Sequence, residues 1–142
     1  MVRESSKFTD KLDLLKASER LESVAKKTNI IYSEKFSKLY NNEVYLKPEN
    51  LQKTGAFKIR GAYNKISKMS EEDKEKGIIS ASAGNHAQGV AYSANKLGVK
   101  ATIVMPTTTP LIKVEGTKKY GVEVVLYGDV YDEAYGHALK LS

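Results

Sequence analysis

The sequence contains no cysteine, only two histidines and no long apolar run. Without cysteine the chain can form neither a disulfide framework nor a thiolate zinc site, and it has no thiol nucleophile. Two histidines alone disfavour any metal centre. Apolar runs of a few residues cannot make a membrane-spanning helix, and no charged-then-apolar leader precedes a small-residue cleavage site. We therefore expect a cytoplasmic protein.

A length of 142 residues with 41% hydrophobic content suits one globular core, or one domain plus part of another. The net charge of +6 raises the question of a nucleic-acid partner. Lysine and arginine are, however, spread along the chain and interleaved with 17 acidic residues, and the usual binding motifs are missing. A solvated basic surface is the preferred interpretation, and we expect no nucleic-acid partner.

The first part of the chain predicts two helices and a short strand. The first helix runs from about Lys11 to Lys27, with Thr9 or Asp10 as N-cap. Its apolar stripe consists of Leu14, Leu15, Leu21, Val24 and Ala25. A second helix follows at Glu34–Tyr40, and Val44–Leu46 is predicted to be a strand, closed by Pro48.

From there the pattern becomes regular. Each of three glycines ends a helical segment that carries lysines near its end, which is typical of a helix C-terminus. These glycines are Gly77, Gly98 and Gly121. The predicted strands after them are 78–80, 101–104 and 122–126, and the predicted helices are 85–97, 111–120 and 131–141. Repeated βα units of this length require a parallel sheet covered by helices, so the fold class is α/β with three αβα layers. The units share no residue signature, which disfavours a repeat protein.

A small, polar, glycine-containing turn, residues 81–89, follows the first of these strands and leads directly into a helix. Ligands of open parallel sheets bind beyond the carboxyl ends of strands, where helix N-termini present unpaired N–H groups. Such a turn can hold a carboxylate or a phosphate. Its side-chain donors are Ser82, Asn85, His86 and Gln88. The alternative is a capped helix start that needs serine and asparagine for turn geometry alone.

The segment 49–62 places Lys58 just inside the start of a helix. Its neighbours are Phe57 and Ile59, with Lys53 and Arg60 close by. A helix N-terminus, nearby cations and partial burial all disfavour the ammonium form, as an amine nucleophile that reacts with an aldehyde requires. An exposed lysine early in a helix is the common alternative, and composition alone favours it.

Taken together, the two segments resemble the lysine motif and the substrate-carboxylate loop of fold type II pyridoxal-phosphate enzymes. The resemblance is to the threonine dehydratase group, which also contains serine dehydratases and serine racemases. The lysine motif is KPENLQKTGAFKIRGAYNKI and the loop is SAGNHAQGVA. They stand in the expected order, and the resemblance extends from about Leu14 to the end of the chain.

The resemblance implies pyridoxal 5'-phosphate as cofactor, held by Lys58 as a Schiff base, with Lys58 also removing the Cα proton of the substrate. Phe57 would pack beside the cofactor, and Asn85 would hydrogen-bond its phenolic oxygen. The implied carboxylate loop consists of Ser82, Gly84, Asn85 and His86. The implied reaction converts L-threonine or L-serine to 2-oxobutanoate or pyruvate and ammonia, in isoleucine biosynthesis or in threonine catabolism.

One position discriminates within the group. In sequences that resemble serine racemases, a second serine stands between the first serine of the loop and its glycine. The resemblance implies that this serine is the acid or base on the opposite face of the substrate. Here that position is Ala83, which transfers no proton. Dehydration is therefore favoured over the racemase alternative.

The resemblance also implies elements that this chain lacks. The family holds the cofactor phosphate with a glycine-rich loop, and places a small polar residue at the pyridine nitrogen, both well downstream of Gly121. We therefore expect a fragment of a homo-oligomer that binds cofactor poorly by itself. Residues 1–48 would belong to the large domain, and residues 49–142 would form the small α/β domain. Thr28-Asn29-Ile30 departs from the Thr-Pro-Leu of many relatives.

Three further hypotheses stay open. A dinucleotide-binding module needs a G-x-G-x-x-G order and an acidic residue after the next strand, and the chain has neither. A non-catalytic α/β domain that associates only with itself is a non-enzyme alternative. Finally, Lys53, Thr54 and Gln88 resemble positions that bind nucleotide effectors such as AMP or CMP in catabolic relatives.

Overall fold

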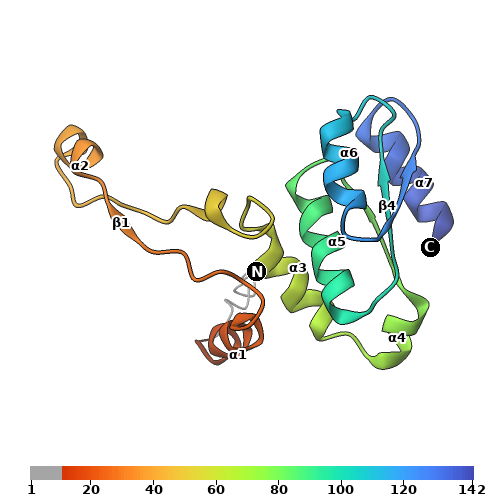
Figure 1. Cartoon of the computed structure of the whole chain (residues 1–142), viewed down its shortest axis with the longest axis horizontal. Coiled ribbons are helices and arrows are strands. Elements are labelled where there is room, and N and C mark those ends of the chain that lie inside the picture. The colour runs from red at the N-terminus through yellow and green to blue at the C-terminus, as the bar shows by residue number, and fades with distance from the viewer. Residues whose placement is uncertain (1–10) are drawn as a thin grey trace, which may run out of the picture.

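The computed structural model describes residues 11–142, so the predicted N-cap at Thr9 or Asp10 lies outside the described part. Two regions are visible in Figure 1: an α/β body, and an N-terminal region from which an arm extends away from that body. The arm holds α2 and its flanking strands, and α1 lies closer to the body.

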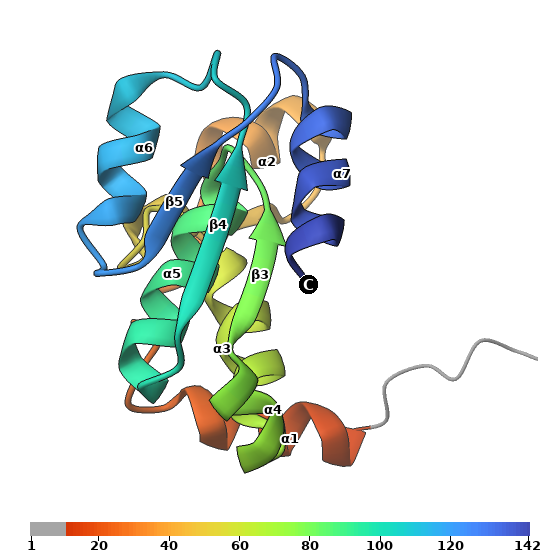
Figure 2. The same cartoon turned by 90° about the vertical axis from the view of Figure 1, so that its right-hand side faces the viewer.

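The body is built on a parallel sheet in the order β3-β4-β5. The strands are β3 (Ile78–Ala81), β4 (Ala101–Met105) and β5 (Glu123–Leu126). Helices α5 (Asn85–Leu97) and α6 (Leu111–Lys118) connect them, as the sequence predicts for βα units. Because all three strands run in one direction, the turns that follow them meet at one edge of the sheet (Figure 2).

Alternate residues of each strand point to opposite faces of the sheet, and each face has its own core. On one face β4 contributes Ala101, Ile103 and Met105, packed under α5, α6 and α3 (Lys58–Ser67). On the other face Val104 packs with residues of α7 (Tyr131–Leu141). Figure 1 shows α5 and α6 on one side of the sheet and α7 on the other, which confirms the three-layer α/β architecture.

The helices end just before the predicted glycines. Gly77, Gly98 and Gly121 all have positive φ angles, between 67° and 84°, a region that side-chain-bearing residues rarely adopt. Gly77 follows the short helix α4 (Glu71–Lys76), which links α3 to β3. On α5, Val90, Ala91 and Ala94 are buried and Leu97 is partly buried.

The N-terminal region departs from the prediction in one helix. Helix α1 (Lys11–Leu21) ends six residues earlier than expected, and Leu14 and Leu15 of the predicted apolar stripe are exposed. Of the residues in the predicted apolar stripe, only Val24 is buried, and it lies beyond the end of the helix. The predicted helix length was wrong because both backbone polar groups of Lys26 bond the Gln52 side chain and do not continue the helix.

The arm consists of α2 (Glu34–Tyr40) between two antiparallel strands, β1 (Ile31–Tyr32) and β2 (Tyr45–Leu46). The C-cap of α2 is Asn41, which adopts a left-handed conformation. Several large apolar side chains of the arm are exposed, among them Ile31, Leu39 and Tyr40. Within residues 11–142, none of the helices is both long and apolar enough to span a bilayer.

Candidate functional site

The turn after β3 leaves donors free at the start of α5. Gly84 is the N-cap of α5 and provides no side-chain hydrogen bond to the first turn. The first N–H groups of a helix have no partner within the helix, so those of the α5 start face outward with the positive end of the helix dipole. The Ser82 hydroxyl accepts a long hydrogen bond of 3.4 Å from the Gly84 N–H, and its own proton remains available.

Lys58 is the first residue of α3, and Phe57 is its N-cap. The short 3-10 helix η1 (Glu49–Leu51) and the following turn lead into this position. Lys58 Nζ lies 5.4 Å from the centroid of the Phe57 ring, and 59% of Phe57 is exposed. The aromatic face and the amine are therefore both open to a ligand.

A close approach of two helices brings the lysine to the turn after β3. Gly89 of α5 abuts the backbone of Lys58: a Cβ built on Gly89 would lie 3.0 Å from the Lys58 carbonyl carbon. Asn85 and His86 lie one helical turn before Gly89 on the same side of α5. The start of α3 thus lies beside the start of α5.

The electrostatics of His86 agree with this placement. The pKa of His86 is lowered, first because neighbouring groups partly desolvate the imidazole and second because of the positive charge of Lys58. The ring keeps contact with solvent, so desolvation is incomplete. A cavity of about 470 Å³ beside His86 is also lined by Ser80 of β3 and Gly61 of α3.

Lys58 differs from the expectation in one respect. The sequence predicts partial burial of the amine, whereas its side chain is exposed in this structure. That part of the prediction was wrong, because the start of α3 buries the next residue, Ile59, completely and leaves Lys58 on the exposed side of the helix.

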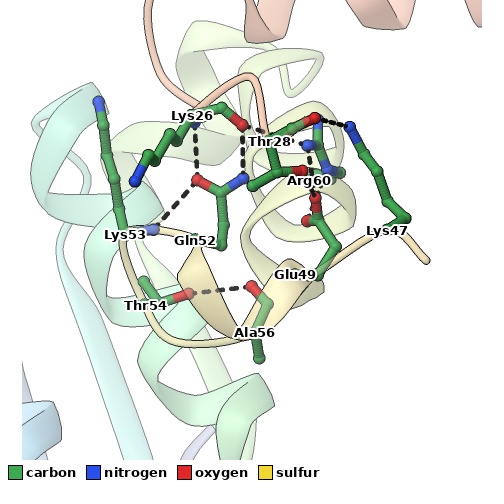
Figure 3. A network of polar contacts seen from close by, with 9 residues as sticks. All are labelled: Lys26, Thr28, Lys47, Glu49, Gln52, Lys53, Thr54, Ala56 and Arg60. Atoms are coloured by element: carbon green, nitrogen blue, oxygen red, sulfur yellow. Dashed lines mark hydrogen bonds and ion pairs between the residues drawn. The ribbon is translucent and has the colours of Figure 1, made fainter. Parts of the chain in front are cut away.

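A polar network, not foreseen from the sequence, supports the turn that carries the lysine (Figure 3). Arg60 donates to both carboxylate oxygens of Glu49, at 2.9 and 2.8 Å. Thr28 donates to the same carboxylate at 2.7 Å. The Gln52 amide bonds both backbone polar groups of Lys26, at 2.7 and 2.9 Å. The network joins the chain before the arm, the turn after it and the first turn of α3.

The bidentate ion pair has a clear electrostatic signature. Hydrogen bonding from Arg60 lowers the pKa of Glu49 to about 2, against the opposing effect of burial. The same pair raises the pKa of Arg60. The sequence signal was only an acidic residue 11 positions before a basic one, a spacing that has no local meaning until the intervening turn folds back.

The remaining predicted residues take different places. Thr54 is buried and donates to the Ala56 carbonyl at 3.4 Å. The Gln88 amide points toward α6, 3.3 Å from where a Cβ on Gly116 would lie. Lys53 is exposed, and its Nζ lies 6.0 Å from the centroid of the Tyr92 ring.

The donor set fits an anionic aromatic aldehyde such as pyridoxal phosphate. An exposed amine beside an exposed aromatic ring can hold the aldehyde and the ring, and Asn85 at the start of α5 can hydrogen-bond a ring oxygen. The free N–H groups at the start of α5 can donate hydrogen bonds to a carboxylate. Lys58, Phe57 and Asn85 are the residues that would hold the cofactor.

Comparison with known proteins identifies the family. The family model described as pyridoxal-phosphate dependent enzyme (PALP) matches residues 21–142. The chain belongs to this family. Membership agrees with the fold and the cofactor expected from the two motifs.

Two similar sequences are an L-threonine ammonia-lyase and an L-threonine dehydratase. The chain is 51% identical to L-threonine ammonia-lyase of Thermotoga maritima over 130 residues, which is 92% of this chain and 32% of that protein. It is 52% identical to L-threonine dehydratase biosynthetic IlvA of Staphylococcus aureus over 133 residues, again 92% of this chain and 32% of that protein. The chain therefore spans about a third of the length of these relatives.

Solved structures of the family share the fold. The processed threonine deaminase isoform 2 of Solanum lycopersicum superposes with a TM-score of 0.82 at 44% identity, over 94% of this chain and 38% of that one. Serine racemase of Dictyostelium discoideum reaches 0.84 at 34% identity, over 92% and 42%. Backbone similarity alone does not separate the two activities, whereas sequence identity is higher to the deaminase.

Proposed function

We propose that this chain carries the catalytic lysine of an enzyme that deaminates L-threonine, or L-serine, to 2-oxobutanoate, or pyruvate, and ammonia. The observation that carries the proposal is the contact of Gly89 with the backbone of Lys58. It supports a single site in which the Lys58 amine and the start of α5 act on one small molecule. The relatives named for this activity support the same reaction.

Lys58 has two tasks in this proposal. Its amine would hold the cofactor, and once free it would accept the proton from the Cα of the substrate. Pyridoxal phosphate, when bound, would supply the electron sink that makes this proton acidic. Phe57 would pack beside the cofactor, and Asn85 would donate a hydrogen bond to it.

The turn after β3 grips the substrate carboxylate in this proposal. The α5 start has no side-chain cap, so its free N–H groups would receive the carboxylate. Ser82, Gly84, Asn85 and His86 are the residues proposed to complete this loop. A carboxylate at a helix N-terminus is favoured by both hydrogen bonding and the dipole. Fixing the carboxylate orients the Cα–H bond toward the lysine.

A racemase is the second candidate, supported by the close superposition with serine racemase of Dictyostelium discoideum. Racemisation needs a proton donor on the face of the substrate opposite the lysine. Ala83 occupies the position in the turn at which the racemase motif has a serine, and its methyl group cannot donate a proton. Deamination is therefore the favoured activity.

The test uses the complete protein that carries this sequence, purified with added pyridoxal phosphate. We expect an absorption band of lysine-bound cofactor near the visible, loss of this band in Lys58→Ala, and release of 2-oxobutanoate and ammonia from L-threonine. A Lys58→Ala protein that kept both the band and the turnover would reject the assignment. Formation of D-serine from L-serine as the main product would favour the racemase.

The proposal extends to the arrangement of the complete protein. We propose that residues 1–48 contribute to a large domain and residues 49–142 form the small one, because the arm leaves the body and exposes apolar residues that need a partner surface (Figure 1). We also propose a cytoplasmic homo-oligomer. Size-exclusion chromatography with light scattering of the complete protein tests the oligomeric state.

Of Lys53, Thr54 and Gln88, only Lys53 is proposed to bind a nucleotide effector. Thr54 uses its hydroxyl internally and Gln88 packs against α6, so neither offers a free group at the surface in the way that Lys53 does. Isothermal titration with AMP and CMP, with Lys53→Ala as the variant, tests this part. The absence of any binding heat would end it.

A further inference from the structure

Gly89 lies where the start of α3 meets α5, the two elements with the most extensive mutual contact in the described chain. A Cβ built there would lie 3.0 Å from the Lys58 carbonyl carbon, 3.1 Å from the Ile59 nitrogen and 3.2 Å from the Lys58 Cβ. These separations are shorter than ordinary van der Waals contacts between heavy atoms. Two of the three atoms belong to the backbone, so no side-chain rotation relieves the contact.

Backbone freedom does not explain this glycine. Gly89 is absent from the positive-φ residues and sits inside the regular helix α5. Glycine is among the poorest helix formers, so local preference would favour alanine at this position. The missing side chain is the feature that matters, because it lets the backbone of Lys58 approach.

The approach fixes the position of Lys58 along α5. Asn85 and His86 precede Gly89 by four and three residues, which is about one turn of 5.4 Å. The start of α3 cannot swing away freely, because Ile59 is completely buried and Arg60 is tied to Glu49. An added methyl group must therefore displace either the lysine or the start of α5, and both movements change the same spacing.

We propose that Gly89 is a positioning residue, which sets the distance between the Lys58 amine and the groups at the start of α5. The inference rests on the proposed function, since it gives this spacing a catalytic purpose. Gly89 itself touches no reacting atom. It acts only through the backbone of Lys58.

The first experiment compares three glycine-to-alanine changes in the complete protein. Gly89→Ala is expected to lower kcat for L-threonine by about 10- to 100-fold, because misplacement of a catalytic group by about 1 Å costs on this order. Gly136→Ala, on α7, meets no atom within 4 Å, and Gly116→Ala meets only the movable Gln88 amide at 3.3 Å. Both controls are expected to stay within about twofold of wild type. Equal kcat values for all four proteins would overturn the proposal.

A second experiment separates positioning of the amine from a general packing defect. Lys58→Ala is supplied with free methylamine as a replacement base, and Gly89→Ala is introduced into that background. A diffusible amine does not depend on the backbone of residue 58, so the second change is expected to cost less than about threefold there. An equal loss in both backgrounds would overturn the positioning role.

A third readout needs neither cofactor nor turnover. The pKa of His86, measured by NMR in the cofactor-free protein, is expected to rise in Gly89→Ala toward the ordinary value of about 6.5 as Lys58 recedes, and to stay constant in Gly136→Ala. The proposal would be overturned if the pKa of His86 were unchanged in Gly89→Ala. It would also be overturned if the Gly89→Ala protein no longer unfolded cooperatively. The Lys58→Ala spectrum decides the proposed function separately, because it does not involve Gly89.

Discussion

The turns after β3 and β4 occupy equivalent places in the fold and differ in their neighbours. Each follows a parallel strand, each leads into a helix on the same face of the sheet, and both lie at the same edge (Figure 2). Neither turn gives the following helix a side-chain cap, since Gly84 precedes α5 and Pro110 precedes α6. In the turn after β4, two threonine hydroxyls bond within the protein.

Two of the three threonine hydroxyls of the second turn bond a neighbouring turn, whereas the buried Thr109 hydroxyl has no hydrogen-bond partner in the described part of the chain. Thr107 Oγ1 lies 2.9 Å from both the Gly128 carbonyl oxygen and the Asp129 carboxylate. Thr108 donates to the Asp129 carbonyl at 2.9 Å. These bonds tie the turn after β4 to the turn after β5, and the helix that follows begins with two exposed apolar residues, Leu111 and Ile112.

The comparison shows that topology alone does not locate the site. Both turns have the position at which open parallel sheets bind ligands. Both helix starts lack a side-chain cap. What distinguishes the first turn is the start of α3, with Lys58, which lies beside it through the Gly89 contact. Four predictions sharpen or break this comparison.

The largest effect is expected for Lys58→Ala. Loss of the general base should lower kcat by roughly 10²–10⁴-fold, because no other group of the turn after β3 replaces an amine. Steady-state assays of 2-oxobutanoate release measure this change in the complete protein. Lys68→Ala, at the exposed C-terminal end of α3, is the matched control, and an equal loss there would remove the special status of Lys58.

Asn85→Ala is expected to lower kcat by about 10- to 100-fold, the range for a lost hydrogen bond to a charged group. Asn95→Ala provides the control on the same helix, since Asn95 is exposed and lies far from the α5 start. Assays of both variants under identical conditions decide the matter. Activity of Asn85→Ala at the wild-type level would contradict a ligand contact at the start of α5.

Glu49→Gln tests the support of the lysine turn through its pH dependence. The folded pKa of Glu49 is lowered from 4.5 to about 2, so its ion pair contributes stability above about pH 4.5 that is lost as the pH falls toward 2. At pH 7 we expect a loss of about 1.5–3 kcal/mol in the free energy of unfolding, shrinking steadily in acid.

Urea unfolding at several pH values measures this difference between wild type and Glu49→Gln. Glu34→Gln serves as the control, because Glu34 forms an exposed ion pair with Lys38 at 2.6 Å and should change stability by less than about 0.5 kcal/mol. A stability difference for Glu49→Gln that did not vary with pH would refute the proposed electrostatic role.

The smallest effect is expected in the turn after β4. Thr107→Val removes a hydroxyl that bonds only within the protein, so it should lower the free energy of unfolding by about 0.5–1 kcal/mol and leave kcat within about twofold of wild type. Thermal unfolding and turnover assays measure the two quantities. A large loss of activity with unchanged stability would assign ligand chemistry to this turn as well.

The elements with local signals were predictable. Helices α2, α5 and α7 begin and end at the predicted residues, because caps and turn residues such as Ser33, Asn41 and Gly98 mark their ends. The end of α1 was not predicted, because it depends on a distant residue: the Gln52 side chain bonds both backbone polar groups of Lys26, which therefore do not continue the helix.

The candidate site was predictable in its residues but not in its support. Lys58 and the turn after β3 stand out because each carries unusual residue types at the end of an element. Their connection through Gly89, and the Glu49–Arg60 ion pair, arise from contacts between segments far apart in sequence. No local periodicity encodes such contacts, so only the folded chain reveals them.

The most direct measurement is chemical trapping of the cofactor on the complete protein. The holoenzyme is reduced with borohydride, digested, and the labelled peptide is located by mass spectrometry. The account predicts a single pyridoxyl label on Lys58, on the peptide that starts α3. A label on another lysine, with Lys58 unmodified, would contradict it.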